Sequence, residues 1–307
     1  MACIAANSAN YLVSTSATTA GATITHKGQT YTVGTTAFAS IKALMAASPA
    51  ANSTVNVLAG TYADNVTINV AGLTFLGPNA YIDKRAQTRN SNAAITGVIT
   101  VNADNTTING FYIKESGQIK NTAATNTAPL SGFTFIYNVV SNPSVARDAN
   151  GSNAVILLGT PVSNANANAD SSQKRYQKVT IAHNIFSKNE GTTDPAWVTI
   201  SGGYGSAMKI IDNKFTEGGT AINICNSRGT HDILNNNFAK IGNNNINETT
   251  KGDFAIRLYR NAYAGTTVFN IKNNDFNNCS GQQTLYPCIR FYCGTTDSEN
   301  FVTPKIC

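Results

Sequence analysis

The chain has 307 residues, of which 42% are hydrophobic and only 12% are charged, so it can bury a substantial core in one large domain or two ordinary ones. Its net charge is +6, but the basic residues are scattered, and the small cluster at Lys174, Arg175 and Lys178 is typical of a solvated loop. We therefore expect no nucleic-acid partner. No stretch approaches the roughly 20 apolar residues of a membrane-spanning helix, so we also expect no membrane span.

The first 34 residues predict a separate hairpin or attachment segment. Residues 23–33, TITHKGQTYTV, read as two short strands about Lys27 and Gly28. The first residues have neither a basic start nor a continuous apolar run, so no signal peptide is visible. We expect either that a signal has been removed or that the protein leaves a cytosol by assembly or lysis.

Residues 35–68 predict a short helix that leads into the first strands. Within TTAFASIKALMAASPAANSTVNVLAGTYADNVTI, a helix at about 36–47 places Phe38, Ile41 and Leu44 on one apolar face. Such a helix can cover the end of a stack of strands, whose edge groups are otherwise unpaired. The GTY that follows then begins the first full turn.

One short unit recurs five times between residues 133 and 276. Its copies are FTFIYNVV, VTIAHNIF, MKIIDNKF, HDILNNNF and FNIKNNDF, and each carries an asparagine at the same place between two apolar residues. These residues are Asn138, Asn184, Asn213, Asn236 and Asn274. Asparagine tolerates a left-handed backbone and can hydrogen-bond to its equivalent in a neighbouring copy, so we predict a ladder of asparagines at a bend.

A second unit alternates with the first and has the period of two that is typical of strands with one buried face. Aligned without gaps, its copies are AVILLG (154–159), WVTISG (197–202), AINICN (221–226), AIRLYR (255–260) and CIRFYC (288–293). The alignment predicts two buried columns, which are Val155, Val198, Ile222, Ile256 and Ile289, and Leu157, Ile200, Ile224, Leu258 and Phe291. Short strands that recur with loops of unequal length predict a coil whose turns stack about 4.8 Å apart.

Residues 35–293 resemble the right-handed parallel β-helix families of the pectin-lyase-like fold, including their internal asparagine ladder. The resemblance implies an all-β protein, a single-stranded right-handed parallel β-helix with a short N-terminal capping α-helix, followed by a polar end section at 294–307. Enzymes of this fold act on polysaccharides. They use clustered aspartates for hydrolysis, or arginine or lysine with calcium-binding carboxylates for elimination.

The sequence offers few residues for that chemistry. Hydrolysis by paired carboxylates needs them on the same or adjacent turns, and no Asp-Asp pair or calcium-type acidic group is visible. The weak catalytic candidates are His183 and Asp212, which align in the column directly before the asparagines and form either an acid-base pair or a surface hydrogen bond at a bend. Glu190 and Asp194 either line a groove or lie in a solvated loop. We expect no cofactor and no metal site.

Arginine and tyrosine gather at the outward positions of the second unit and predict a binding strip. Tyrosine rings stack on sugars, and arginine donates planar hydrogen bonds to carboxylates or sulfates, although the same residues also mark protein interfaces. Trp197 either packs under a loop or offers a sugar platform. The predicted binding residues are Arg257, Tyr259, Arg260, Arg290, Tyr292 and Trp197.

The cysteines lack the paired spacing of a zinc site. Cys225 lies in a strand pattern and is predicted to be a buried thiol. The C-terminal cysteines hold one or two disulfides or none; these are Cys279, Cys288, Cys293 and Cys307.

Three functions remain open. We expect a non-catalytic structural or adhesive β-helix, either a phage virion component (tail spike, fibre or decoration) or a surface adhesin, that contacts a polysaccharide or cell-surface glycan and other virion or surface proteins. Its location is then the virion or the extracellular surface, and the resemblance to phage spikes favours a homo-oligomer, above all a trimer. The alternative is a secreted polysaccharide lyase or glycoside hydrolase of the same fold. A third reading is a cytosolic scaffold without a glycan role.

Overall fold

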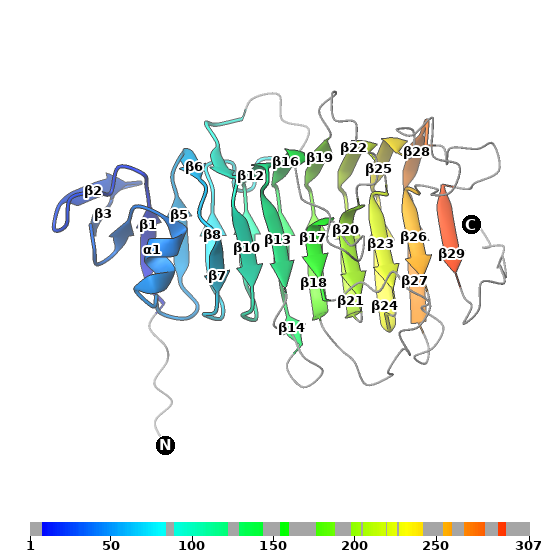
Figure 1. Cartoon of the computed structure of the whole chain (residues 1–307), viewed down its shortest axis with the longest axis horizontal. Helices are drawn as coiled ribbons and strands as arrows, with labels where there is room; N and C mark the ends of the chain where they lie inside the picture. Colours follow the sequence, from blue (N-terminus) through cyan, green and yellow to red (C-terminus); the bar gives the residue numbers. More distant parts are fainter. Residues whose placement is uncertain are drawn as a thin grey trace, which may run out of the picture.

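The computed structural model describes residues 8–83, 89–121, 129–143, 154–159, 176–187, 198–203, 205–218, 220–225, 227–241, 254–259, 267–279 and 288–292. These residues form an elongated coil of short parallel strands, with the helix near one end and the last strands at the other (Figure 1). Each full turn of the coil contributes one strand to each of three long parallel sheets. This is the predicted all-β fold, a single-stranded right-handed parallel β-helix.

The three sheets, numbered by the order in which the chain visits them, contain the following strands in spatial order. Sheet 1 contains β4 (Ala37–Phe38), β1 (Asn10–Val13), β5 (Thr54–Val57), β8 (Thr74–Leu76), β11 (Thr107–Asn109), β15 (Thr134–Ile136), β18 (Tyr176–Ala182), β21 (Gly205–Ile211), β24 (Gly229–Leu234) and β27 (Thr267–Lys272), with β14 (Leu130–Ser131) beside β18. Sheet 2 contains β6 (Gly60–Tyr62), β9 (Ala93–Ile95), β12 (Tyr112–Glu115), β16 (Val139–Pro143), β19 (Ile185–Ser187), β22 (Lys214–Gly218), β25 (Asn237–Ile241) and β28 (Asp275–Asn277). Sheet 3 contains β7 (Val66–Ile68), β10 (Val98–Val101), β13 (Gln118–Asn121), β17 (Ala154–Leu158), β20 (Val198–Gly203), β23 (Ile222–Cys225), β26 (Ile256–Tyr259) and β29 (Ile289–Tyr292).

The core is built from columns of inward side chains that stack from turn to turn. The column of sheet 1 is Val55, Phe75, Ile108, Phe135, Ile181, Ile210, Ile233 and Ile271. The column of sheet 2 is Tyr62, Ile95, Ile113, Val140, Phe186, Phe215, Phe238 and Phe276. Most of these side chains are buried, and they contact one another in a single hydrophobic cluster that runs along the axis.

The register of sheet 3 corrects the gap-free alignment of the second strand unit. Ile156 lies opposite Ile200, and Ile200 lies opposite Ile222, so neither Val155 nor Val198 occupies the column of Ile222. The alignment was therefore off by one residue in β17 and by two in β20. It was correct from β23 to β29, where Ile222, Ile256 and Ile289 lie in one column.

The N-terminal end of the coil is covered, as predicted, but its details differ from the prediction. The helix α1 (Ile41–Ala46) is shorter than the expected 36–47, because Ala37–Phe38 form β4 and Ser40 caps the helix by accepting a hydrogen bond from the Ala43 N–H. Its buried residues are Ile41 and Leu44. Phe38 packs in the same cluster from β4.

Residues 1–34, which were expected outside the coil, contribute one strand to it. β1 pairs in parallel with β5, so sheet 1 begins before the helix. The predicted hairpin is present as β2 (Thr23–His26) and β3 (Gln29–Thr32), which pair in antiparallel register around Lys27 and Gly28, both at positive φ. In the described part of the chain no helix has the length and apolar character needed to cross a membrane.

Candidate functional site

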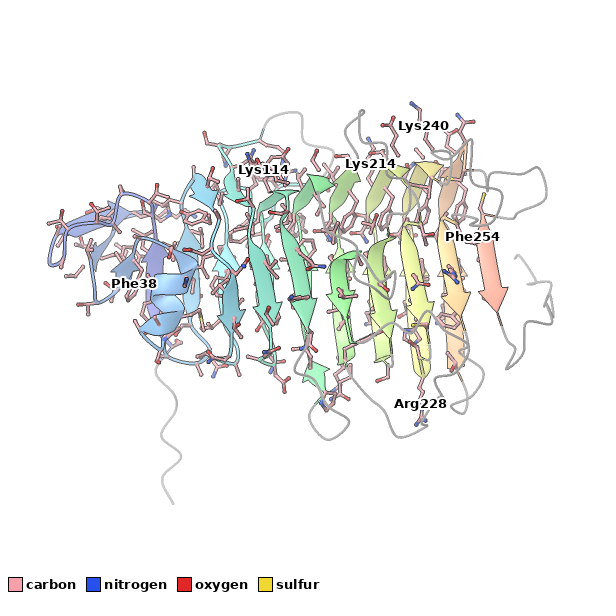
Figure 2. All side chains as sticks on the ribbon, in the orientation of Figure 1. Phe38, Lys114, Lys214, Arg228, Lys240 and Phe254 are labelled. Atoms are coloured by element: carbon pink, nitrogen blue, oxygen red, sulfur yellow. The ribbon has the colours of Figure 1, made fainter. Side chains whose placement is uncertain are left out.

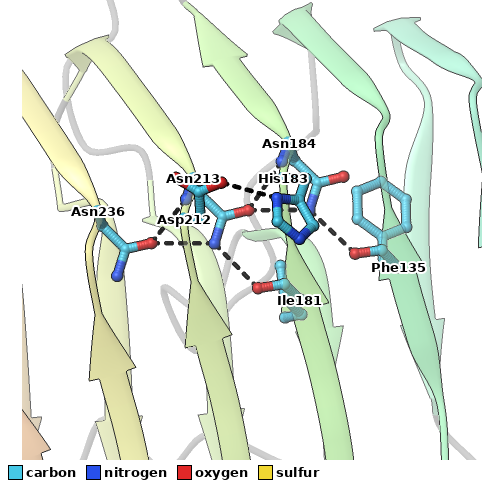
Figure 3. A network of polar contacts seen from close by, with 7 residues as sticks. All are labelled: Phe135, Ile181, His183, Asn184, Asp212, Asn213 and Asn236. Atoms are coloured by element: carbon cyan, nitrogen blue, oxygen red, sulfur yellow. Dashed lines mark hydrogen bonds and ion pairs between the residues drawn. The ribbon is translucent and has the colours of Figure 1, made fainter. Parts of the chain in front are cut away.

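The predicted asparagines lie in one file at the bend between sheets 1 and 2. The side-chain oxygens of Asn184, Asn213, Asn236 and Asn274 each accept the backbone N–H of the preceding asparagine at 2.9–3.0 Å. They also accept its side-chain amide at 2.9–3.2 Å. The second amide hydrogen goes to a backbone carbonyl, as in the bond of 2.9 Å from Asn213 to Ile181 (Figure 3). The ladder is therefore both buried and satisfied.

The left-handed backbone at this bend belongs to the residue before each asparagine, which corrects the prediction. Tyr137, His183, Asp212, Asn235 and Asn273 have φ between 54° and 58°. Because this conformation turns their side chains away from the core column, the asparagine points inward and its predecessor lies on the outside of the bend.

These outward residues form a line along the coil, which we call the corner ridge: Tyr81, Tyr137, His183, Asp212, Asn235 and Asn273. At its centre, Nδ1 of His183 lies 2.7 Å from Oδ2 of Asp212 on the next turn, as expected from the alignment (Figure 3). The two side chains are 35% and 29% exposed, so a ligand can reach them. The ridge lies across the coil from sheet 3, because it occupies the corner between the other two sheets.

Two tyrosines continue the ridge towards the N-terminal end. The ring of Tyr137 stacks on His183 with a centroid separation of 4.8 Å and an interplanar angle of 11°. Tyr81 meets Tyr137 edge-on at 5.8 Å and is 64% exposed. Gly110 precedes Tyr137 in the column, and a Cβ there would lie 2.0 Å from the Ala80 nitrogen, so the absence of a side chain lets the segment of Tyr81 pass over it.

Arg89 holds the backbone of this part of the ridge. Its Nη2 donates to the Tyr137 carbonyl oxygen at 3.1 Å. Burial lowers the pKa of Arg89, and in the described part of the chain its Nε is buried without a hydrogen-bond partner. No sequence pattern marks Tyr81 or Arg89, because neither lies in the repeat. Both reach the ridge from the segment after β8.

The geometry favours binding over acid-base catalysis at the ridge. Paired catalytic carboxylates stand about 5–10 Å apart so that the scissile bond and a water fit between them. His183 and Asp212 instead contact each other directly, so no scissile bond fits between them and both lie on the same side of a bound ligand. An imidazole held by a carboxylate can still orient or polarise a hydroxyl group that approaches its other nitrogen.

Three other described carboxylates bond to side chains on adjacent turns. Glu217 pairs with Lys240 at 3.1 Å, and Asp275 accepts from the Asn237 amide at 2.9 Å. Asp232 accepts from the Asn270 amide at 2.8 Å. Among the described residues, no group of three or more His, Cys, Asp or Glu side chains is placed to hold a metal ion.

The predicted strip on sheet 3 is in register wherever the structure describes it. Arg257 lies opposite Arg290, and Tyr259 lies opposite Tyr292. Arg257 is half-buried, and the side chains of the other three lie outside the described part of the structure. Arg260, Trp197, Glu190 and Asp194 also lie outside the described residues.

Towards the N-terminal end, the strip continues differently from the prediction. The alignment placed Thr199 beside Asn223, but Ser201 lies opposite Asn223, whose amide donates to Ser201 Oγ at 3.2 Å. Arg257 lies on the other side of Asn223, as predicted. Ser201 and Cys225 are both buried. The outward strip on sheet 3 is thus confined to the turns from Asn223 onward.

Three cysteines lie in the described part of the chain, and these are Cys225, Cys279 and Cys288. Cys225 is buried, as predicted. Cys279 and Cys288 form no disulfide, although the Cys288 thiol donates to the Cys279 carbonyl oxygen at 3.0 Å. Burial raises the pKa of both thiols. Cys293 and Cys307 lie outside the described residues.

Comparison with known proteins gives a distant structural similarity. No family model and no curated protein matches the sequence. Among solved structures, a pectate lyase from a Bacillus species, crystallised in complex with trigalacturonate, matches with 14% sequence identity and a TM-score of 0.32. The match covers 79% of this chain and 80% of that one. The chain has the parallel β-helix architecture of pectin-lyase-like proteins, as its own strand register establishes.

Proposed function

We propose that the chain is a structural or adhesive β-helix of a virion or cell surface, which contacts an acidic glycan through the outer face of sheet 3. The observation that carries the proposal is the register of β26 and β29, which places Arg257 opposite Arg290 and Tyr259 opposite Tyr292. Strands in a sheet are about 4.8 Å apart, so two copies of the same Arg-Tyr unit lie on neighbouring turns.

The paired arginines favour an anionic ligand. Arginine donates planar, charge-assisted hydrogen bonds to a carboxylate or sulfate, so two arginines on neighbouring turns suit such a ligand. Each arginine has a tyrosine two residues later in its strand, and a tyrosine ring with its polar tip suits the face and edge of a sugar. A linear polysaccharide with one acidic group per sugar can contact both turns.

A non-catalytic role is supported by what the described carboxylates do. Asp212 contacts His183 directly, and Glu217 and Asp275 bond to side chains on neighbouring turns. These bonds link successive turns and leave the groups in stabilising roles. The hairpin of β2 and β3 projects beyond the covered end of the coil, where it suits attachment to other surface or virion proteins (Figure 1). We propose a homo-oligomer, with a trimer favoured; light scattering after size-exclusion chromatography measures it.

Affinity electrophoresis in gels that contain acidic or neutral polysaccharides tests the glycan. We expect acidic polysaccharides to retard the protein, and Arg257→Ala to weaken that retention about tenfold, since a charged hydrogen bond is worth about 1.5–3 kcal/mol. The matched control is Lys214→Ala, which removes a cation on sheet 2, on the side of the coil where Lys114 and Lys240 also lie (Figure 2). Equal retention by Arg257→Ala, Lys214→Ala and the parent protein would refute the site.

The alternative, a polysaccharide lyase or glycoside hydrolase, is tested on the same panel. A lyase leaves an unsaturated product that absorbs in the ultraviolet, and a hydrolase leaves new reducing ends. Turnover of any retained polysaccharide would replace the adhesive proposal with an enzymatic one.

A further inference from the structure

We propose that the corner ridge is a second glycan-binding site, which takes a neutral linear glycan lying parallel to the axis of the coil. It is separate from the proposed acidic-glycan site, because the ridge lies across the coil from sheet 3. Four of its side chains are linked by direct contacts from Tyr81 to Asp212, and Asn235 and Asn273 continue it over the next two turns.

The shape of the ridge suits a chain of sugars. Each turn of the coil places one side chain on it, so its groups follow one another at the spacing of neighbouring strands, about 4.8 Å. Tyr81 offers the exposed ring on which the C–H face of a sugar can pack. Tyr137 is covered on one face by His183 and so presents its edge and hydroxyl group.

The polar groups select a neutral ligand. The Asp212 carboxylate accepts hydrogen bonds from sugar hydroxyls and repels a second carboxylate. The amides of Asn235 and Asn273 both donate and accept, which matches hydroxyl groups and carries no charge. An acidic glycan therefore fits the arginines of sheet 3, and a neutral glycan fits the ridge.

The backbone fixes the position of Tyr137 on the ridge. Tyr137 has a φ of 56°, the left-handed conformation that recurs directly before each ladder asparagine. Arg89 donates a hydrogen bond to its carbonyl oxygen at 3.1 Å. The aromatic side chain is therefore held at a defined place beside His183.

The test titrates the full chain with neutral hexaoses of glucose, mannose, galactose or xylose by isothermal titration calorimetry. We expect at least one hexaose to bind, and we expect Tyr81→Ala and Asp212→Asn each to weaken it about tenfold. Asparagine at 212 repeats the residue that Asn235 and Asn273 place in this column, so that variant keeps the fold. Lys240→Ala is the matched control, since Lys240 lies on sheet 2 outside both proposed sites, and it leaves the affinity for the neutral hexaose unchanged.

Other outcomes overturn the inference. Failure of every hexaose to bind, or equal binding by the parent, Tyr81→Ala and Asp212→Asn, shows that the ridge is no glycan site. A change of oligomeric state in Tyr81→Ala, without hexaose binding, identifies the ridge as a protein contact instead. Affinity electrophoresis of Arg257→Ala tests the sheet 3 site, and calorimetry of the ridge variants tests the ridge. Either proposal can therefore be refuted while the other stands.

Discussion

The first and last turns of the coil build the same bend and the same core columns from different residues. In the N-terminal turns, residues 54–140, the core column of sheet 2 holds Tyr62, Ile95, Ile113 and Val140. In the C-terminal turns, residues 176–277, that column holds Phe186, Phe215, Phe238 and Phe276, whose rings stack 4.8–5.0 Å apart. The outer face of sheet 1 changes too, from Thr54, Thr74, Thr107, Thr134 and Thr180 to Lys209, Asp232 and Asn270.

The bend shows what this difference means. From Asn138 to Asn236 each asparagine bonds to the turns on both sides, whereas the earlier bends depend on close backbone approach, as between Gly110 and Ala80. A coil of stacked turns gains stability from each turn and from the contacts between neighbours. The C-terminal turns place more of that coupling in a single buried side chain per turn. The free energy of unfolding should therefore fall more after one substitution in a buried bend of the C-terminal turns than after one in the N-terminal turns.

The largest effect is expected from breaking the ladder. Asn213→Ala removes two hydrogen bonds that its oxygen accepts from Asn184 and two that its amide donates, to Ile181 and Asn236. Buried groups of the neighbours are left unpaired, at about 1–3 kcal/mol each, so we expect the free energy of unfolding to fall by about 4 kcal/mol. Urea denaturation followed by circular dichroism measures it.

The control for the ladder is Asn237→Ala, one residue after a ladder position. Asn237 lies on sheet 2 and donates to Asp275 in an exposed bond. We expect its loss to cost less than about 0.5 kcal/mol, as is usual for surface substitutions. Similar values for Asn213→Ala and Asn237→Ala would mean that the ladder does not couple the turns.

The second largest effect is a loss of folding stability at low pH, and it is expected in the C-terminal turns. Burial lowers the pKa of His231 from 6.5 to about 4, while its Nε2 donates to the Arg228 carbonyl oxygen at 2.9 Å and its Nδ1 accepts from the Met208 N–H. Between these pH values the unfolded chain binds more protons than the native chain, so stability is full above pH 6.5 and declines as pH falls towards 4. The total loss is about 3 kcal/mol.

Hydrogen exchange at pH 7.5 and 4.5 localises this effect. After correction for the intrinsic rate, protection should fall in β24 and its neighbours β21 and β27 and persist in β8 and β11, where no histidine is present. Uniform loss of protection along the coil would assign the acid sensitivity to carboxylates instead. Unchanged protection in β24 would show that His231 stays neutral or is tolerated charged.

The sequence predicted the register of the bend between sheets 1 and 2 better than the register of sheet 3 for a physical reason. A polar residue that recurs at a buried bend, such as Asn184 or Asn213, marks the register in each copy. The strands of sheet 3 lack such a marker, because alternate apolar residues look alike after a shift of two positions. Ile200 was therefore aligned with Ile224 instead of Ile222. In β17 both faces are apolar, and even a shift of one residue went unseen.

The residues of the candidate site also differ in how well the sequence predicted them. His183 and Asp212 were predicted as neighbours because they precede ladder asparagines, and their contact at 2.7 Å confirms that alignment. Tyr81 and Arg89 lie outside any repeat, and only the chain path across Gly110 brings them to the ridge. Columns can be predicted from periodicity, whereas a contact made by an irregular segment depends on the three-dimensional path of the backbone.

The smallest expected effect separates the ridge from the ladder beneath it. Asp212→Asn removes a partly exposed ion pair with His183, and such pairs contribute at most about 1 kcal/mol. Asparagine accepts the left-handed backbone, so we expect the free energy of unfolding to change by less than about 0.5 kcal/mol. Asp212→Val is the contrast, since a β-branched residue at positive φ should cost more than 1 kcal/mol. If Asp212→Asn instead destabilises the chain as much as Asn213→Ala, the pair belongs to the scaffold, and the stability of the bend would explain His183 and Asp212 without a ligand.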